Sequence, residues 1–532
     1  MANPNLIVAY CGGKWNDNDC NFSTPTEHNV DNIVNDWGNA ISGTSVNRPK
    51  NETDADAFIF EKKEDNSITL HVFKTNCPQT MTCTYNGAGK IINDNTNIWK
   101  KNVNNGKIVV MANYNSFLTP NANNSIRIGS YGRNEDYQGF VESANTVEFS
   151  FINDANGDLP SSTNKRMFEG VDTLVSCDIP CQMRNISDNT FKGCTKLTGY
   201  TNPDWFETIG QSAFEGCTSL STIKIGRPTK ISGRTFANCT GATTIEWSNT
   251  KESENKCRMA KIADSAFRGC TSLRYTKFSG DSSAQDAIII PHGVTEIGSY
   301  AFEGCTSIKN LKMYGVTKID DNAFNGCQKL SGVSGFYSVT EVGESSFAGA
   351  GYEKGSFPSP TIRHDLGSMG DLSNLTSIGN SAFAAVYTSS NIIIKSSTVG
   401  DRAFYKAKIG GLNFGTETES ENAISIGAEA FSEVEFVSHN VVFNCKTKIG
   451  NSAFSECNIS RIDINTDTTG TTIERETDSF DSGVTVYLNK FSKGESTPEQ
   501  YDDWVKFYGE NNKWVNCIIV DKYGEILYDR SV

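Results

Sequence analysis

The stretch Ile297-Gly-Ser-Tyr-Ala-Phe302-Glu-Gly-Cys305-Thr-Ser-Ile308 decides the fold, because closely similar stretches recur along most of the chain. Two clear copies are Ile186-Ser-Asp-Asn-Thr-Phe-Lys-Gly-Cys-Thr-Lys-Leu197 and Ile209-Gly-Gln-Ser-Ala-Phe-Glu-Gly-Cys-Thr-Ser-Leu220. The shared pattern is I-x-x-x-x-F-x-x-C-x-x-L. Self-similarity with a period of about 20 to 50 residues is the sequence signature of a solenoid or another repeat array.

The phenylalanine of this pattern sets the length of the unit. Its commonest spacing is 22 to 23 residues, and the longer intervals contain insertions. The copies are Phe168, Phe191, Phe214, Phe236, Phe267, Phe302, Phe324, Phe347, Phe383, Phe404, Phe431, Phe454 and Phe480. After each copy comes a segment such as Leu220-Ser-Thr-Ile-Lys-Ile225, whose alternation predicts a short strand with its apolar residues pointing inward. The Ser-Ala-Phe-Glu-Gly-Cys stretch is long enough for one short helical or 3₁₀ turn.

One unit of this length cannot enclose its own Ile, Phe and Leu. The expected fold is therefore a solenoid of about twelve stacked repeats over residues 161–490. Burial of each repeat Phe contributes about 1.5–3 kcal/mol, and truncation to Ala costs about 3–5 kcal/mol.

These repeats resemble the BspA-type leucine-rich repeats of bacterial and protist surface proteins, whose consensus reads much like I-G-x-x-A-F-x-G-C-x-x-L. The resemblance extends over residues ~165–490. It implies a non-enzymatic protein of the cell surface or extracellular space that adheres to or binds a protein or another cell. It assigns no catalytic residue and names no ligand.

Charge and composition exclude several classes of partner. The 532 residues carry a net charge of −14, which argues against nucleic acid and anionic membrane surfaces as the main partner. The longest apolar stretches fall far short of the ~20 residues that span a bilayer, so membrane insertion is not expected. The N-terminus lacks the basic region of a secretory signal peptide, which leaves removal of the signal or another export route open.

Seven of the 16 cysteines occupy one repeat position: Cys194, Cys217, Cys239, Cys270, Cys305, Cys327 and Cys457. Other units place Ala350, Val386, Ala407 or Val434 there, so the position favours a small buried group over a redox pair or a metal ligand. Cys177 with Cys181, and Cys77 with Cys83, could each form a local disulfide or stay reduced. Neither pair has a second Cys or His pair at zinc spacing. No cofactor or metal is expected.

The flanking regions differ from the repeats. Residues 1–160 alternate short β-prone runs with polar turns, which predicts a β-sandwich ending near Gly157 to Pro160. The segment Val109–Ser130 is weakly similar to the carbohydrate-associated, Ig-like BACON modules. Residues 491–532 depart from the repeat and are expected to form a C-terminal cap over the exposed end of the core. The fold class is mainly β throughout.

The leading functional hypothesis is recognition of a protein or glycan through solvent-facing strand positions. The candidate binding residues are Lys224, Glu246, Lys277, Lys312, Asn413, Arg461 and Asp463. A second hypothesis is a structural component of a phage virion, assembled with itself or other virion proteins through the N-terminal domain. A glycan-active enzyme is the least favoured, and no catalytic residue is assigned. The insertions Ser248–Arg258, Ser279–Ile290 and Gly351–Leu375 are further places for specific function, because loops project from one edge of a solenoid.

Overall fold

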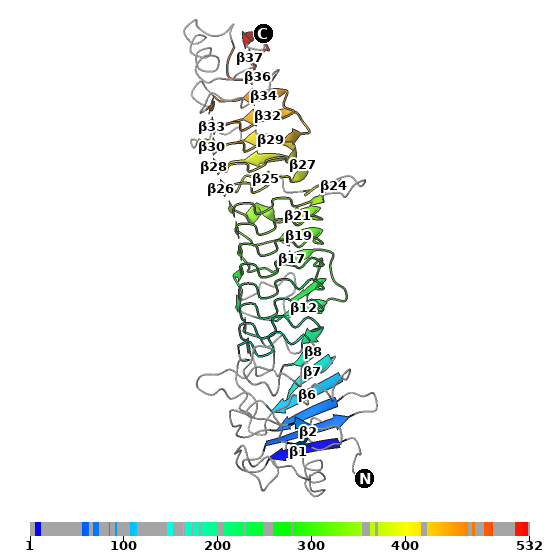
Figure 1. Cartoon of the computed structure of the whole chain (residues 1–532). Coiled ribbons are helices and arrows are strands. Elements are labelled where there is room, and N and C mark those ends of the chain that lie inside the picture. Colours follow the sequence, from blue (N-terminus) through cyan, green and yellow to red (C-terminus); the bar gives the residue numbers. More distant parts are fainter. Residues whose placement is uncertain are drawn as a thin grey trace. The chain divides into compact units, whose positions relative to one another are not determined.

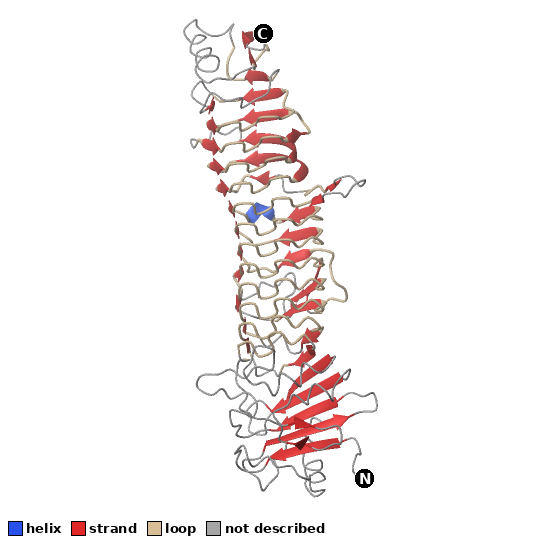
Figure 2. Ribbon diagram, viewed as in Figure 1, coloured by secondary structure: helices blue, strands red, loops and turns tan. Residues whose placement is uncertain are grey.

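The computed structural model contains two compact units, Met1–Asn249 and Thr250–Val532, each built of strands and turns (Figures 1 and 2). Before residue 163 the structure describes only the backbone of strands within 6–11, 56–62, 68–73, 84–85, 91–92, 107–113 and 146–152. From there it describes residues 163–492 and 517–529, with gaps at 164, 173, 180–183, 201–205, 227–229, 248–258, 279, 354–361, 368–370, 416–422, 467–470 and 474–483.

In the first unit, the described N-terminal strands join one seven-stranded sheet in the order β1-β2-β3-β6-β7-β8-β10. The bounds are β1 (Leu6–Cys11), β2 (Asp56–Lys62), β3 (Ile68–Phe73), β6 (Lys107–Asn113), β7 (Thr146–Ile152), β8 (Leu174–Asp178) and β10 (Gly199–Tyr200). The first two pairings are antiparallel and the others are parallel. Besides these, β4 (Thr84–Tyr85) and β5 (Ile91–Ile92) form a small antiparallel pair.

This arrangement does not support the expected β-sandwich. A sandwich needs two sheets packed face to face. Here the larger described strands share one sheet, and β7 pairs in parallel with β8 of the first repeat. Alternating β-prone runs reveal strands but not their partners, which is why the sequence pattern did not distinguish one extended sheet from two packed ones.

The remaining strands of the first unit belong to the repeats. One face has β9 (Asn185–Ile186), β11 (Thr208–Ile209) and β13 (Lys230–Ile231), and another has β12 (Thr222–Ile225) paired with β14 (Thr244–Trp247). All these pairings are parallel and in register from one coil to the next. For example, Ile223 lies beside Ile245, and both are buried.

The second unit continues the same pattern with longer stacks. A nine-stranded parallel sheet, called here the short-strand face, consists of β15 (Lys261–Ile262), β18 (Glu296–Ile297), β20 (Lys318–Ile319), β22 (Glu341–Val342), β26 (Ser377–Ile378), β28 (Thr398–Val399), β30 (Ile424–Ile426), β33 (Thr447–Ile449) and β35 (Thr471–Ile473). In Figure 1, β26, β28, β30 and β33 form part of this stack.

The other face of the second unit, called here the long-strand face, consists mostly of longer strands. It begins with β16 (Tyr275–Phe278) and the sheet of β17 (Ile288–Ile290), β19 (Asn310–Met313) and β21 (Gly332–Ser334). It continues with β25 (Asp371–Leu372), β27 (Tyr387–Ile394), β29 (Lys408–Phe414), β31 (Glu435–Phe436), β32 (Asn440–Phe443), β34 (Arg461–Ile464), β36 (Thr485–Leu488), β37 (Ile518–Asp521) and β38 (Ile526–Asp529).

Two features interrupt this regular stack. The hairpin of β23 (Tyr352–Glu353) and β24 (Ile362–Arg363) projects from its side (Figure 1). At the C-terminal end, β38 is antiparallel to β37 and ends the parallel series. The apolar helical pattern at Tyr501–Tyr508, part of the expected cap, lies outside the described residues.

The segment around each repeat Phe is a series of turns, and the expected short helical piece is absent from the described copies. Around Phe214, for example, Ser212 has φ 53° and Gly216 has φ 77°, so left-handed residues stand two places before and two places after this Phe. A right-handed helix cannot pass through them. The backbone turns outward instead and bonds to the next coil, since Phe214 N–H donates to Thr235 O at 2.8 Å. The one described helical segment is the 3₁₀ turn η2 (Phe336–Ser338), blue in Figure 2.

The expected aromatic interior is confirmed. The repeat phenylalanines within the described residues are at most 1% exposed, and they stack ring on ring inside each unit. Neighbouring rings in the second unit, from Phe267 through Phe454, have centroids 5.0–5.7 Å apart and interplanar angles of 3–23°. Offset stacking at such distances stabilises aromatic pairs beyond simple burial.

The repeat thiols are buried as expected, but they also have a polar role that the sequence did not reveal. Cys327 Sγ donates to the carbonyl oxygen of Phe302, in the preceding coil, at 3.3 Å. Cys194, Cys217, Cys239, Cys305 and Cys457 make the equivalent bond at 3.0–3.2 Å. The same Phe302 oxygen also accepts from Cys305 N–H. The carbonyl is therefore satisfied without a thiol, which explains why Ala or Val fits in other coils. Cys77, Cys83 and Cys181 lie outside the described residues.

Candidate functional site

Five of the seven predicted binding positions have side chains that reach solvent without a described ion pair. In the first unit, Lys224 and Glu246 are register partners on β12 and β14, with Lys224 exposed and Glu246 half-buried. In the second unit, Lys277, Lys312 and Asn413 are half-buried on β16, β19 and β29. They lie on the long-strand face, as the alternating pattern predicts.

The prediction that Asp463 faces solvent is wrong. Asp463 is 7% exposed, and Arg461 donates to both of its oxygens at 2.7 and 2.9 Å. Asn489 donates to the same carboxylate at 3.1 Å. Burial alone raises the pKa of Asp463, but the bonds from Arg461 and Asn489 outweigh it and hold this pKa below its ordinary value.

Arg461 belongs to the same group of interacting side chains as Asp463 and Asn489. Its guanidinium lies 3.8 Å from the centroid of Tyr487, in addition to the paired bonds to Asp463. Asparagines then link the coils, since Asn489 donates to Asn465 at 2.8 Å and Asn465 donates to Asn444 at 2.6 Å. Arg461 and Asp463 thus connect coils to one another, and their charges are satisfied internally.

Lys312 lies in a groove on the long-strand face. This β19 groove has a volume of about 310 Å³ and is lined by residues from 285–287, 310–312 and 332–334. Asp286 is held by Arg274 through two bonds of 2.6 Å, which keep the pKa of Asp286 below its ordinary value. Lys312 makes no ion pair with the described residues, so its ammonium group is available to a ligand.

A second concave site lies at the hairpin of β23 and β24. This hairpin pocket has a volume of about 380 Å³ and is lined by Tyr352, Arg363, Tyr387, Lys408 and Glu435. Sequence reasoning marked the insertion that contains Tyr352 and Arg363 but none of these five residues. A sequence indication did exist for the other three, because Tyr387, Lys408 and Glu435 each stand four residues after a repeat Phe.

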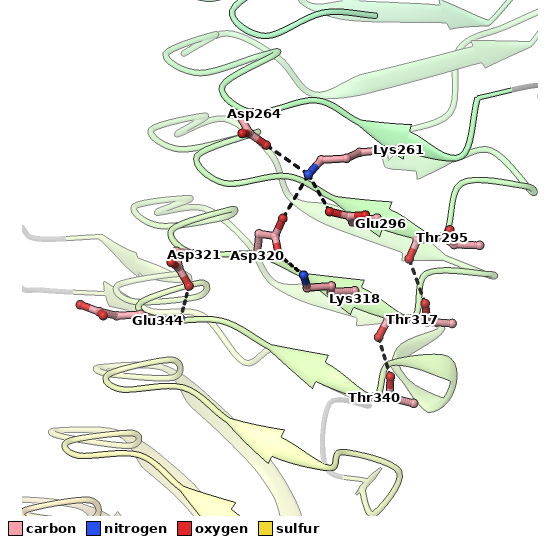
Figure 3. Close-up of polar contacts among 10 residues, drawn as sticks. All are labelled: Lys261, Asp264, Thr295, Glu296, Thr317, Lys318, Asp320, Asp321, Thr340 and Glu344. Atoms are coloured by element: carbon pink, nitrogen blue, oxygen red, sulfur yellow. Dashed lines mark hydrogen bonds and ion pairs between the residues drawn. The ribbon is translucent and has the colours of Figure 1, made fainter. Parts of the chain in front are cut away.

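The short-strand face uses its charges differently (Figure 3). Lys261 Nζ lies 2.6 Å from Glu296 and 3.3 Å from Asp320, and Lys318 Nζ lies 3.1 Å from Asp320. Hydroxyls form a parallel row, in which Thr317 donates to Thr295 O at 3.2 Å and Thr340 donates to Thr317 O at 3.1 Å. The charges of Lys261, Glu296, Lys318 and Asp320 neutralise one another, and their contacts hold neighbouring coils together.

Among the described residues, no group of three or more His, Cys, Asp or Glu side chains is placed to hold a metal ion. A search of the same residues for a helix long and apolar enough to cross a bilayer finds none.

Comparison with known protein families identifies the family to which the repeats belong. The model of the BspA-type leucine-rich repeat region matches residues 161–283, 254–365 and 365–477, with six copies. The chain belongs to this family. The BspA-type match begins at residue 161 and does not confirm the weak BACON-like similarity of the N-terminal region.

Three solved structures of leucine-rich repeat proteins resemble this BspA-type chain. The leucine-rich repeat protein of Treponema pallidum is 23% identical, with a TM-score of 0.27, over 39% of this chain and 78% of its own. A Bacteroides ovatus leucine-rich repeat protein is 17% identical, with a TM-score of 0.33, over 79% and 98% of the two chains. A leucine-rich cell surface protein of Faecalibacterium prausnitzii is 16% identical, with a TM-score of 0.34, over 84% and 95%. No curated protein matches the chain.

The BspA-type repeat solenoid fits a non-enzymatic binding role. The family match names no specific partner and gives no support to the virion alternative.

Proposed function

We propose that this BspA-type protein is a non-enzymatic recognition protein of the cell surface or extracellular space. It binds a protein or glycan partner through the outward side chains of its long-strand face. The family membership and the contrast between the inward and outward rows of this face support the proposal.

That contrast is the observation that carries the proposal. In consecutive coils of the second unit, one inward register row reads Ile394, Phe414, Phe443, Ile464 and Leu488. The neighbouring row reads Ile393, Asn413, Val442, Asp463 and Tyr487, and all of these except the buried Asp463 are partly exposed. Stacking requires an apolar interior in every coil, but it leaves the outward side chains free to differ. A surface whose side chains change from coil to coil offers a specific pattern to one partner.

The short-strand face is a weaker candidate for the same role. Its outward register row begins with Lys261, Glu296, Lys318 and Glu341, which alternate in charge. Since ion pairs bridge this row, a ligand would have to break existing contacts in order to bind there. On the long-strand face, neither Lys277 nor Lys312 makes an ion pair with a described residue, and Asn413 is uncharged.

The test is an array of glycans and soluble proteins probed with the full chain. Ligands found in this way are then measured against a triple variant with Lys277→Ala, Lys312→Ala and Asn413→Ala. The matched control carries Glu341→Ala, Ser377→Ala and Ser425→Ala, three outward positions of the short-strand face. We expect the first variant to lose affinity and the control to retain it, at unchanged melting temperatures. Loss only in the control would move the binding surface to the short-strand face.

A further inference from the structure

The hairpin pocket has one wall built from the regular coils. Tyr387 is the register partner of Lys408, and Lys408 is the register partner of Glu435, so the three side chains come from successive coils. Tyr387 and Lys408 are half-buried, and Glu435 is exposed. Lys408 Nζ pairs with a Glu435 oxygen and lies 5.7 Å from the centroid of the Tyr387 ring. This wall presents an aromatic ring, a cation and a carboxylate side by side.

The opposite wall is the hairpin itself, and backbone bonds connect it to the coils. Tyr352 and Arg363 are antiparallel register partners on β23 and β24. The hairpin starts at Gly351, whose N–H donates to Cys327 O at 3.0 Å, and it closes where His364 N–H donates to Gly351 O at 2.7 Å. Gly351 has φ 70°, and a Cβ there would lie 2.7 Å from Leu330 O, so the tight exit of the hairpin requires glycine.

The connection back to the first wall is equally direct. Leu366 N–H donates to Tyr387 O at 2.9 Å, and Asp365 Oδ1 accepts from Ser389 N–H at 3.1 Å. Arg363 is therefore two residues from a bridge to the strand that carries Tyr387. The two walls of the pocket are therefore joined by the Leu366–Tyr387 backbone bond and by the Asp365 carboxylate.

The hairpin pocket contains an exposed cation that is not neutralised by a described acid. Arg363 is exposed and lies 5.7 Å from the Tyr352 centroid, but it makes no ion pair with the described residues. The one acid of the β23–β24 hairpin strands, Glu353, lies 3.5 Å from His364 Nε2. The sequence between the two strands, residues 354–361, contains no Asp or Glu. In a chain of net charge −14, Arg363 is thus an exposed cation with no ion-pair partner among the described residues.

We propose that the hairpin pocket binds the acidic sugar residue of a glycan, with the Arg363 guanidinium donating two hydrogen bonds to the sugar carboxylate. The planar guanidinium matches a carboxylate in a way that a simple ammonium does not. Tyr352 and Tyr387 contact the sugar ring and bond to its hydroxyls, and Glu435 accepts from a further hydroxyl. This proposal rests on the recognition function above and deepens it by naming a ligand class.

Size and lining favour such a sugar over an apolar ligand. A volume of about 380 Å³ lies in the range of small-molecule sites, about 300–1,000 Å³. The five lining residues include no aliphatic side chain, so an apolar peptide anchor has little to pack against, whereas a ligand rich in hydroxyls finds donors and acceptors on both walls. The carboxylate of the ligand could belong to a uronic acid or a sialic acid, which share this chemistry.

Calorimetric titration of the full chain tests the proposal. The acidic probes are trigalacturonic acid and 3′-sialyllactose, the neutral probes are maltotriose and lactose, and hexaglutamate represents an acidic peptide. We expect at least one acidic oligosaccharide to bind at least tenfold more tightly than its neutral counterpart. Arg363→Gln should weaken that binding at least tenfold. The affinity of Arg363→Lys should lie between those of the wild type and Arg363→Gln. Lys329→Gln is the matched control and should bind like the wild type, because Lys329 is exposed, makes no ion pair with the described residues and does not line the pocket.

Other outcomes overturn the proposal. These are equal affinity for acidic and neutral sugars, wild-type affinity in Arg363→Gln, or hexaglutamate binding as tightly as the acidic sugars, which would assign the pocket to acidic peptides. If Arg363→Gln changes the melting temperature, the same titration of Lys408→Gln, which alters the opposite wall, provides the second measurement. Each of these outcomes would overturn the pocket proposal alone, because recognition of an array ligand through the outward strand positions would stand.

Discussion

The ring of Phe302 stacks on the ring of Phe324 with centroids 5.3 Å apart and an interplanar angle of 3°. The same relationship repeats between neighbouring coils, so the interior of each unit is a column of aromatic rings. In such an array each coil is stabilised mainly by its two neighbours. A defect in one ring therefore weakens two interfaces at once.

Replacing Phe324 with Ala should lower the free energy of unfolding by about 3–5 kcal/mol, through lost burial and the cavity left between Phe302 and Phe347. Phe324→Leu should cost less, because much of the volume remains. Urea denaturation followed by circular dichroism measures both. Tyr337→Ala is the control, since Tyr337 is 61% exposed and should change stability by less than about 0.5 kcal/mol. Equal effects at the two positions would contradict an aromatic interior.

The repeat thiols should make the protein less stable at high pH. Burial raises the pKa of Cys327 from 9.0 to about 12. The folded state therefore keeps a proton that the unfolded chain releases, and stability falls as the pH rises from about 9 towards 12. Each such thiol contributes up to about 1.4 kcal/mol per pH unit within this window.

Denaturation under reducing conditions at pH 7.5, 9 and 10.5 measures this effect. Cys327→Ala should cost about 1 kcal/mol at pH 7.5, because the Phe302 carbonyl keeps its bond from Cys305 N–H. The variant should then lose less stability than the wild type as the pH rises. Parallel curves for the two proteins would show that the buried thiol does not titrate as expected.

Asp463 should matter for stability and have little effect on binding. Asp463→Asn removes the charge that pairs with Arg461 and should lower stability by about 1–3 kcal/mol at pH 7. Because the pKa of Asp463 lies below its ordinary value of 3.8, its contribution is present above about pH 4 and is lost as the pH falls through the lowered pKa. The acid limb of the stability curve should therefore be flatter in the variant. Unchanged stability at pH 7 would argue for a free, ligand-binding carboxylate.

Each charged side chain of the short-strand face should contribute little to the free energy of unfolding. Lys261→Gln removes the contact of 2.6 Å to Glu296 and those to Asp264 and Asp320, but the Lys261 side chain is 39% exposed. We expect a loss of about 0.5–1 kcal/mol at low ionic strength, shrinking in 1 M NaCl because salt screens exposed pairs. Thermal melts at two salt concentrations provide the measurement. A loss that does not change with salt would indicate packing of the lysine stem as the main contribution.

The sequence by itself determined the length of the repeat, where each strand lies within it, and which side chains form the interior. A period of 22 to 23 residues, an alternating strand and one Phe per unit are local patterns, and local patterns predict which side chains point inward. Phe302 and Cys305 are buried for this reason, and Lys312 and Asn413 lie on the outward side as expected.

Only the tertiary structure decided which side chains meet across coils. The bond from Cys327 to the Phe302 carbonyl depends on the stacking register, as does the burial of Asp463 between Arg461 and Asn489. The hairpin pocket depends on it further, because Arg363 comes near Tyr387 only after an insertion folds back along the coils. Alternation along one strand fixes inside and outside, whereas contacts between strands are set by the paths of the connections between them, which no local pattern encodes.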